Sequence, residues 1–86
     1  MSNTREVIVD VIGKIRSQKD MPDVELSDDK RVIDDLGFRS LDVAQLIAML
    51  ELELGVDPFA EGLPLTDVNT IGEVEQAYQN SIDKNA

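Results

Sequence analysis

The feature that most constrains the fold of this chain is the helical spacing of its apolar residues in three segments. In each segment, apolar side chains recur every three or four positions, which places them on one face of an α-helix. Helices are therefore predicted over residues 4–17, over residues 41–54 and from Thr70 onward. No segment alternates apolar and polar residues for long enough to predict a strand. The residues assigned to buried faces are Val7, Ile8, Val11, Ile12 and Ile15, then Leu41, Ala44, Ile47, Leu50 and Leu54, and then Ile71, Val74, Tyr78 and Ile82.

Two long loops, residues 18–39 and 56–69, are expected to connect these helices. A short helical turn is predicted at 65–68 in the second loop. Loops of this length in a compact domain are functional or are held by their own apolar anchors. The chain is therefore predicted to form one all-α domain over residues 1–86, with three main helices, one short helix and long loops. The expected anchors of the first loop are Val24, Leu26, Val32, Ile33 and Leu36.

Several residues mark where the helices begin and end. Thr70 and Glu73 have the spacing of a capping box, and Gly55 is placed to end the second helix. Ser40 precedes the second helix, and serine is a favoured N-cap residue. A capping box at Ser40 requires Glu or Gln at position 43, where the chain has Val43. No reciprocal bond is therefore expected at that position.

The composition excludes several classes of function. The chain has no cysteine and no histidine, which removes disulfides, thiolate metal sites and the commonest general base. Its net charge of −10 argues against nucleic-acid binding. Between Ser40 and Asp83 there are nine acidic residues and no Lys or Arg. This half is either a solvated surface or a docking surface for enzymes with basic patches, and the position of Ser40 at its border favours docking.

Two further kinds of site are not predicted. The carboxylate pairs Asp28-Asp29 and Asp34-Asp35 lack the alternating ligands, central glycine and terminal glutamate of a calcium loop. These acids are better explained by loop solvation and by negative charge before a helix, so no metal site is expected. No signal peptide or membrane span is visible, which predicts a cytoplasmic protein with no membrane insertion.

Ser40 is the candidate functional residue. It follows Gly37 and opens an apolar helix, so its hydroxyl lies at the positive end of a helix dipole. A phosphate-bearing group is favoured at such a position. The chain has no histidine, and no lysine lies near Ser40 in the sequence to activate it as a nucleophile. Another enzyme must therefore supply the base, which predicts a modified protein and not an enzyme.

The chain resembles the acyl carrier proteins in the run DLGFRSLD at residues 35–42 and in the helix that follows, which ends in LELELG at residues 50–55. The signature of that family is an acidic residue, Leu-Gly, two variable positions and then Ser-Leu opening an acidic helix. The resemblance covers nearly the whole chain and implies an acyl-carrier-like four-helix bundle. It also implies that a phosphopantetheinyl transferase attaches 4′-phosphopantetheine from coenzyme A to Ser40. The thiol of that arm would carry acyl groups as thioesters.

The resemblance further implies that partner enzymes dock around the helix that follows Ser40. Acyl-loading, acyl-transfer or condensing enzymes with basic patches are the expected partners. Typical fatty-acid carriers have Asp before the serine, where this chain has Arg39. The Arg39 side chain is expected either to pair with a phosphodiester or an acidic partner, or to be simply solvated. Leu52 and Gln45 occupy positions that are often acidic, and Leu52 is either an exposed apolar contact or faces the 56–69 loop. The expected docking residues are Arg39, Leu41, Asp42, Gln45, Ala48, Glu51 and Leu52.

Three functional hypotheses follow from these features. The leading one is a discrete, monomeric acyl carrier protein of fatty-acid, lipid or polyketide-type biosynthesis, with an unusual set of partners. The second is a discrete peptidyl or aminoacyl carrier, because such carriers often have a non-acidic residue before the serine. The third is a small acidic helical adaptor with the same fold that is never modified and docks through residues 42–53. The position of the terminal helices near the chain ends favours a discrete carrier over an excised module.

Overall fold

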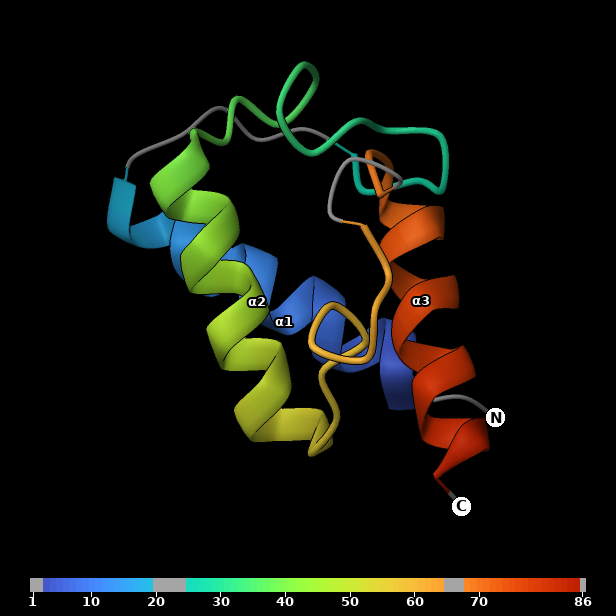
Figure 1. Cartoon of the computed structure of the whole chain (residues 1–86). Helices are drawn as coiled ribbons and strands as arrows, with labels where there is room; N and C mark the ends of the chain where they lie inside the picture. The colour runs from blue at the N-terminus through green and yellow to red at the C-terminus, as the bar shows by residue number, and fades with distance from the viewer. Residues whose placement is uncertain (1–2, 20–24, 65–67, 86) are drawn as a thin grey trace.

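Three α-helices make up most of the described structure, which is a computed structural model covering residues 3–19, 25–64 and 68–85 (Figure 1). They are α1 (Asn3–Lys19), α2 (Ser40–Leu54) and α3 (Ile71–Lys84). Within these ranges there is one isolated antiparallel bridge, between Arg31 and Thr70, and no strand. The all-α prediction is confirmed for these ranges. The short helical turn predicted at 65–68 falls, at residues 65–67, outside the described part of the chain.

The helix α1 lies across the other two helices and contacts both of them (Figure 1). In the same view, α2 and α3 begin at the same end of the molecule, and the loop that precedes α2 runs over that end. The chain after α2 passes between α2 and α3 before it reaches α3. This arrangement places the start of α2, with Ser40, beside a loop that also contacts the start of α3.

The buried faces of α1 and α3 agree with the sequence prediction. Ile8, Val11, Ile12 and Ile15 of α1 are buried, and Val7 packs against them. The apolar stripe of α3 is buried at Ile71, Val74 and Tyr78 and half-buried at Ile82.

The predicted buried face of α2 is confirmed at Leu50, which is buried, and at Leu54, which packs against the core. It is wrong at Leu41, which is 73% exposed, and at Ala44, which is also exposed. Leu46, which was not predicted to face inward, is buried beside Leu50. Because α2 carries apolar residues on nearly every side, its periodicity cannot select the face that meets α1.

The first loop enters the core at three positions. Val32, Leu36 and Phe38 are buried, whereas the predicted anchor Ile33 is 56% exposed. A tight turn explains the difference, because the Leu36 amide donates to the carbonyl of Arg31 at 3.1 Å and brings Val32 and Leu36 to the inner side. Phe38 was not expected as an anchor. The predicted anchor at position 24 lies outside the described residues, and the one at position 26 packs against the core.

Backbone hydrogen bonds join this loop to Asn69 and to the first two residues of α3. A side chain at Gly72 would crowd this junction, since its Cβ would lie 3.2 Å from the Asp28 carbonyl oxygen. The loop is therefore held at its middle as well as at its ends. The three bonds run from the Val32 amide to the Asn69 carbonyl at 2.9 Å, from the Ile71 amide to the Lys30 carbonyl at 3.0 Å, and from the Gly72 amide to the Asp28 carbonyl at 3.0 Å.

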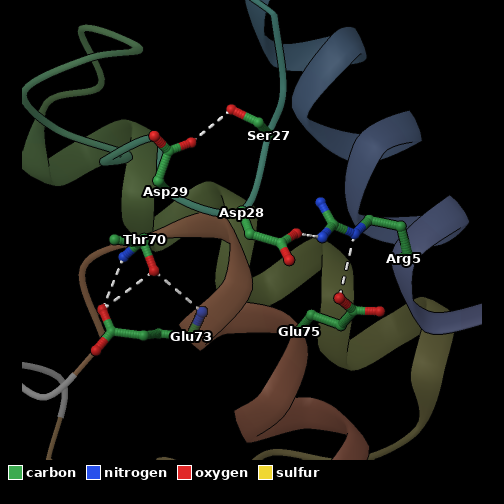
Figure 2. Close-up of polar contacts among 7 residues, drawn as sticks. All are labelled: Arg5, Ser27, Asp28, Asp29, Thr70, Glu73 and Glu75. Atoms are coloured by element: carbon green, nitrogen blue, oxygen red, sulfur yellow. Dashed lines mark hydrogen bonds and ion pairs between the residues drawn. The ribbon is translucent and has the colours of Figure 1, made fainter.

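Arg5 of α1 stabilises the same junction from the other side (Figure 2). Its guanidinium pairs with Asp28 of the loop, and its Nε donates to a carboxylate oxygen of Glu75 in α3 at 3.2 Å. The buried Thr4 hydroxyl donates to the side-chain carbonyl oxygen of Gln79 at 2.8 Å. The N-terminal turn of α1 is thus tied to both the loop and α3.

The predicted capping box of α3 is confirmed (Figure 2). The Glu73 amide donates to the Thr70 hydroxyl oxygen at 3.1 Å, and the Glu73 carboxylate accepts from the Thr70 amide at 3.0 Å. That carboxylate also accepts from the Asn69 amide at 3.0 Å. These bonds, led by the one from Asn69, lower the pKa of Glu73 below its ordinary value.

Glu73→Gln is expected to lower the melting temperature by a few degrees at pH 7, because the amide is a weaker acceptor than the carboxylate. Because the pKa of Glu73 is lowered on folding, the stabilisation is fully present above the ordinary value of 4.5 and disappears as the pH falls through the lower folded value. The difference between variant and wild type should therefore shrink under acid. Thermal unfolding by circular dichroism between neutral and acidic pH measures it, with Glu53→Gln on α2 as the control. An equal effect of both substitutions would contradict the prediction.

The second loop is held against α3 and the residue that follows it by two hydrogen bonds and one aromatic contact. The Glu61 carboxylate accepts from the buried Ser81 hydroxyl at 2.6 Å and from the Asn85 side chain at 3.0 Å. The rings of Phe59 and Tyr78 meet edge to face, with centroids 6.1 Å apart and planes at 75°. Edge-to-face packing of this kind is favourable between aromatic rings.

The Tyr78 hydroxyl is buried and has no hydrogen-bond partner among the described residues. Burial, with smaller effects from Asp57 and Glu51, raises the pKa of Tyr78 well above its ordinary value, so the hydroxyl stays neutral.

Tyr78→Phe is expected to raise the free energy of unfolding by about 1 kcal/mol, because it removes a desolvated hydroxyl and keeps the ring. Tyr78→Ala, which removes the ring as well, should cost about 3–5 kcal/mol. Urea unfolding measures both, and a destabilised Tyr78→Phe variant would contradict the prediction.

Candidate functional site

Ser40 is the first residue of α2, and its side chain is exposed. The N-cap is Arg39, with φ −97° and ψ 173°, so Ser40 is not the capping residue of this helix. Gly37 has φ 78°, a left-handed conformation that suits glycine. Immediately after it, Phe38 is buried in the core, and the chain then enters α2. The glycine and the buried ring together set the point at which Ser40 emerges.

Asp42, and not Ser40, supplies the capping bond of α2. Its carboxylate accepts from the Arg39 amide at 3.0 Å, and the residue is only 4% exposed. An arginine side chain has no acceptor, so the capping interaction is one-sided. The negative charge of Asp42 also lies at the positive end of the helix dipole. Asp42 was expected to meet partner enzymes, but its burial removes it from the docking surface.

A cleft of about 620 Å³ opens beside Ser40. One wall is α2, where the lining residues recur along one side of the helix from Ser40 to Glu51, a rise of about 16 Å. The other wall is the first loop together with the residues before α3. The lining is mostly apolar and includes three ionisable residues. The lining residues are Arg31, Val32, Ile33, Asp34, Ser40, Val43, Ala44, Ile47, Ala48, Glu51, Val68 and Asn69.

The remaining predicted docking residues lie on or near the exposed side of α2. Leu41 and Leu52 are 73% and 84% exposed, so Leu52 is an exposed apolar residue and does not pack under the second loop. Arg39, Ala48 and Glu51 are exposed as well. Gln45 is half-buried, and its amide donates to the side-chain carbonyl of Gln18 in α1 at 3.4 Å.

The acidic pairs of the first loop make contacts within the protein. The Asp28 carboxylate pairs with Arg5, and the Asp29 carboxylate accepts from the Ser27 hydroxyl at 2.6 Å, which lowers the pKa of Asp29 (Figure 2). The Asp35 carboxylate accepts from the Arg31 amide at 2.7 Å.

Over residues 3–19, 25–64 and 68–85, no three potential ligand residues gather in a metal-binding arrangement. In the same ranges, every helix is too short or too polar to span a bilayer.

The geometry around Ser40 fits a covalently bound phosphodiester. The first-turn amides of a helix have no acceptor four residues before them, and their dipoles favour an anion at this end. Arg39, the residue before Ser40, adds a cation at an exposed position. The adjoining cleft has room for a flexible arm of mixed polar and apolar character. An exposed hydroxyl, an anion-favouring helix end and a neighbouring cleft therefore meet at one residue.

Asp42→Ala is expected to lower the free energy of unfolding by about 1–2 kcal/mol, because the Arg39 amide loses its acceptor. Asp42→Asn keeps an acceptor oxygen and should cost less. Urea unfolding followed by circular dichroism measures both variants, with the exposed Glu51→Ala as the control. A loss at Asp42→Ala no larger than that of the control would show that the capping bond is not stabilising.

Comparison with known proteins identifies the family. The sequence model described as a phosphopantetheine attachment site matches residues 5–78, a segment that includes Ser40, all of α2 and most of α1 and α3. No solved structure gives a significant match to the chain. Members of this family carry covalently attached 4′-phosphopantetheine, and a phosphopantetheinyl transferase and partner enzymes act on them. The match covers most of the chain, which therefore belongs to the family of phosphopantetheine-binding carrier proteins.

Proposed function

We propose that this chain is an acyl carrier protein in which Ser40 holds the 4′-phosphopantetheine arm. The observation that carries the proposal is the position of Ser40, an exposed hydroxyl at the first residue of α2 that lines the 620 Å³ cleft. When bound, the arm supplies the thiol that carries acyl groups as thioesters, which suits a chain without cysteine. The carrier itself performs no catalysis in this proposal.

Loading requires chemistry that this chain does not supply. The Ser40 oxygen forms a bond to the phosphorus of coenzyme A that bears the pantetheine. The bond from that phosphorus to the oxygen of the leaving adenosine 3′,5′-bisphosphate breaks, and the serine proton passes to a base of the transferase. The chain has no histidine to act as that base. Its own contributions are to present the hydroxyl and to stabilise the new anion at the start of α2.

The cleft gives the arm a place to lie along α2. Val43, Ile47 and Val68 provide an apolar lining, which suits the methyl and alkyl parts of the arm or of an acyl group. Ordinary burial of apolar surface would hold these groups without specific hydrogen bonds. Arm and cargo can therefore leave the cleft for a partner enzyme at modest cost.

The proposed setting is fatty-acid, lipid or polyketide-type biosynthesis in the cytoplasm, with a monomeric carrier that serves acyl-loading, acyl-transfer or condensing enzymes. Arg39 supports the second candidate, a peptidyl or aminoacyl carrier, because it places a cation where fatty-acid carriers have an acid. The two candidates share Ser40 and the arm and differ in the group that the thiol carries. Mass spectrometry of the species loaded in cells separates them.

Incubation with coenzyme A and a broad-specificity phosphopantetheinyl transferase is expected to add the mass of one phosphopantetheinyl group to the wild-type protein. Ser40→Ala should gain nothing, because it lacks the accepting oxygen. Ser17→Ala, at an exposed serine of α1, is the matched control and should load like the wild type. Intact-protein mass spectrometry reads all three.

An unloaded wild type would contradict the carrier proposal and favour the unmodified adaptor. Loading of Ser40→Ala would show that another hydroxyl is the attachment point.

A further inference from the structure

The cleft beside Ser40 reaches a carboxylate at the other end of α2. Its lining follows one side of the helix, from Ser40 in the first turn to Glu51 in the last, with apolar residues between them. Glu51 is exposed, and among the described residues its carboxylate makes no hydrogen bond or ion pair. The charge of Glu51 can therefore act on a group that enters the cleft.

The two ends of α2 carry opposite charge. The helix dipole leaves a partial positive charge at Ser40 and a partial negative charge in the last turn. Glu51 and Glu53 add to the negative end, and the last turn contains no basic residue. Burial raises the pKa of Tyr78 most, and the charges of Asp57 and Glu51 raise it further, so the negative field extends inward from this end. An anion is thus stabilised beside Ser40 and a cation beside Glu51.

Arg31, the basic residue among the described lining residues, already has acidic neighbours. Its guanidinium lies 3.5 Å from the Asp34 carboxylate, which also lines the cleft. Hydrogen bonds led by the one from Asn69 lower the pKa of Glu73, and the charge of Arg31 lowers it further. A carboxylate on the cargo would compete with both acids for Arg31. The cleft therefore favours a cationic group over an anionic one.

The distance along α2 from Ser40 to Glu51 matches the length of the phosphopantetheine arm. The rise between the two residues is about 16 Å. The arm has about thirteen bonds from its phosphorus to its sulfur, which corresponds to roughly 15 Å when the arm is extended. An arm that lies along the cleft from Ser40 therefore brings its thiol, and the first atoms of any acyl group on it, close to Glu51.

We propose that this carrier favours acyl groups that bear an amine close to the thioester, and that the Glu51 carboxylate pairs with the ammonium group of that cargo. This inference rests on the proposed function, since it names the class of acyl group that the arm on Ser40 holds. Of the two candidates for the cargo, it favours the aminoacyl group. The phosphodiester and the ammonium then lie at the two ends of α2 that stabilise them, while Val43 and Ile47 contact the apolar part of the arm.

The test compares three acyl groups of similar size and different charge on the wild-type chain. A broad-specificity transferase moves the acyl-phosphopantetheinyl group onto the protein from β-alanyl-, butyryl- or malonyl-coenzyme A, whose acyl groups are positive, neutral and negative. The β-alanyl form should melt about 1–5 °C above the butyryl form at low salt, the effect of one exposed ion pair in a domain of this size. The malonyl form should melt lowest. Circular dichroism measures all three melting temperatures.

Two glutamine variants test whether Glu51 causes the difference between the β-alanyl and butyryl forms. The difference should disappear in Glu51→Gln and remain in Glu53→Gln, the matched control, because Glu53 is an exposed acid of the same turn that is not among the lining residues. Each comparison uses two cargoes on one variant, so any change in the stability of the variant itself cancels. Raising the salt from 50 to 500 mM should reduce the wild-type difference by at least about half, because an exposed ion pair is screened.

Nuclear magnetic resonance locates the cargo. Backbone amide shifts should differ between the β-alanyl and butyryl forms mainly at residues 47–55. Equal melting temperatures for these two forms of the wild type would overturn the inference and leave the loading of Ser40 intact. Loss of the difference in both variants would overturn it in favour of the general negative charge of the chain. A malonyl form that melts highest would overturn it in favour of Arg31. A wild type that takes no group from any of the three donors would instead refute the proposed function itself.

Discussion

The hydrogen bonds that join residues 28–32 to Asn69 and to the first two residues of α3 hold the first loop in place beside the candidate functional site. Repulsion between like charges opposes the packing of a long acidic loop on an acidic protein. The backbone N–H and C=O groups of the loop also need hydrogen-bond partners wherever they are buried away from water. The junction with α3 satisfies them, and the absence of a side chain at Gly72 permits the close approach. Arg5 adds a cation between two carboxylates at the same place. With the loop held there, one wall of the cleft faces α2, and Ser40 lies at its mouth.

At the start of α2, capping of the helix and exposure of the Ser40 hydroxyl depend on two different residues. Serine before an apolar helix commonly serves as its cap, which would engage the hydroxyl proposed here as an attachment point. Asp42 removes this conflict by capping the Arg39 amide from a buried position. Ser40 is left as the first helical residue, exposed to solvent and not required for the cap. Stability of the helix start and availability of the hydroxyl therefore rest on different side chains.

The composition of α2 has two consequences on two sides of the helix. Its inner side supplies Leu46 and Leu50 to the core, while its outer side exposes Leu41 and Leu52. A surface helix usually has a polar outer face, so the two exposed leucines depart from the usual pattern.

The sequence by itself determined the features that depend on local rules. Helical spacing predicted the three helices, and the spacing of Thr70 and Glu73 predicted the cap of α3. Tertiary structure alone decided which side of α2 is buried, because an apolar helix has no preferred face until α1 packs against it. It also decided that Asp42 is buried and that Phe38, not Ile33, anchors the loop. Those outcomes depend on a turn and on contacts between residues far apart in the chain, which local spacing does not encode.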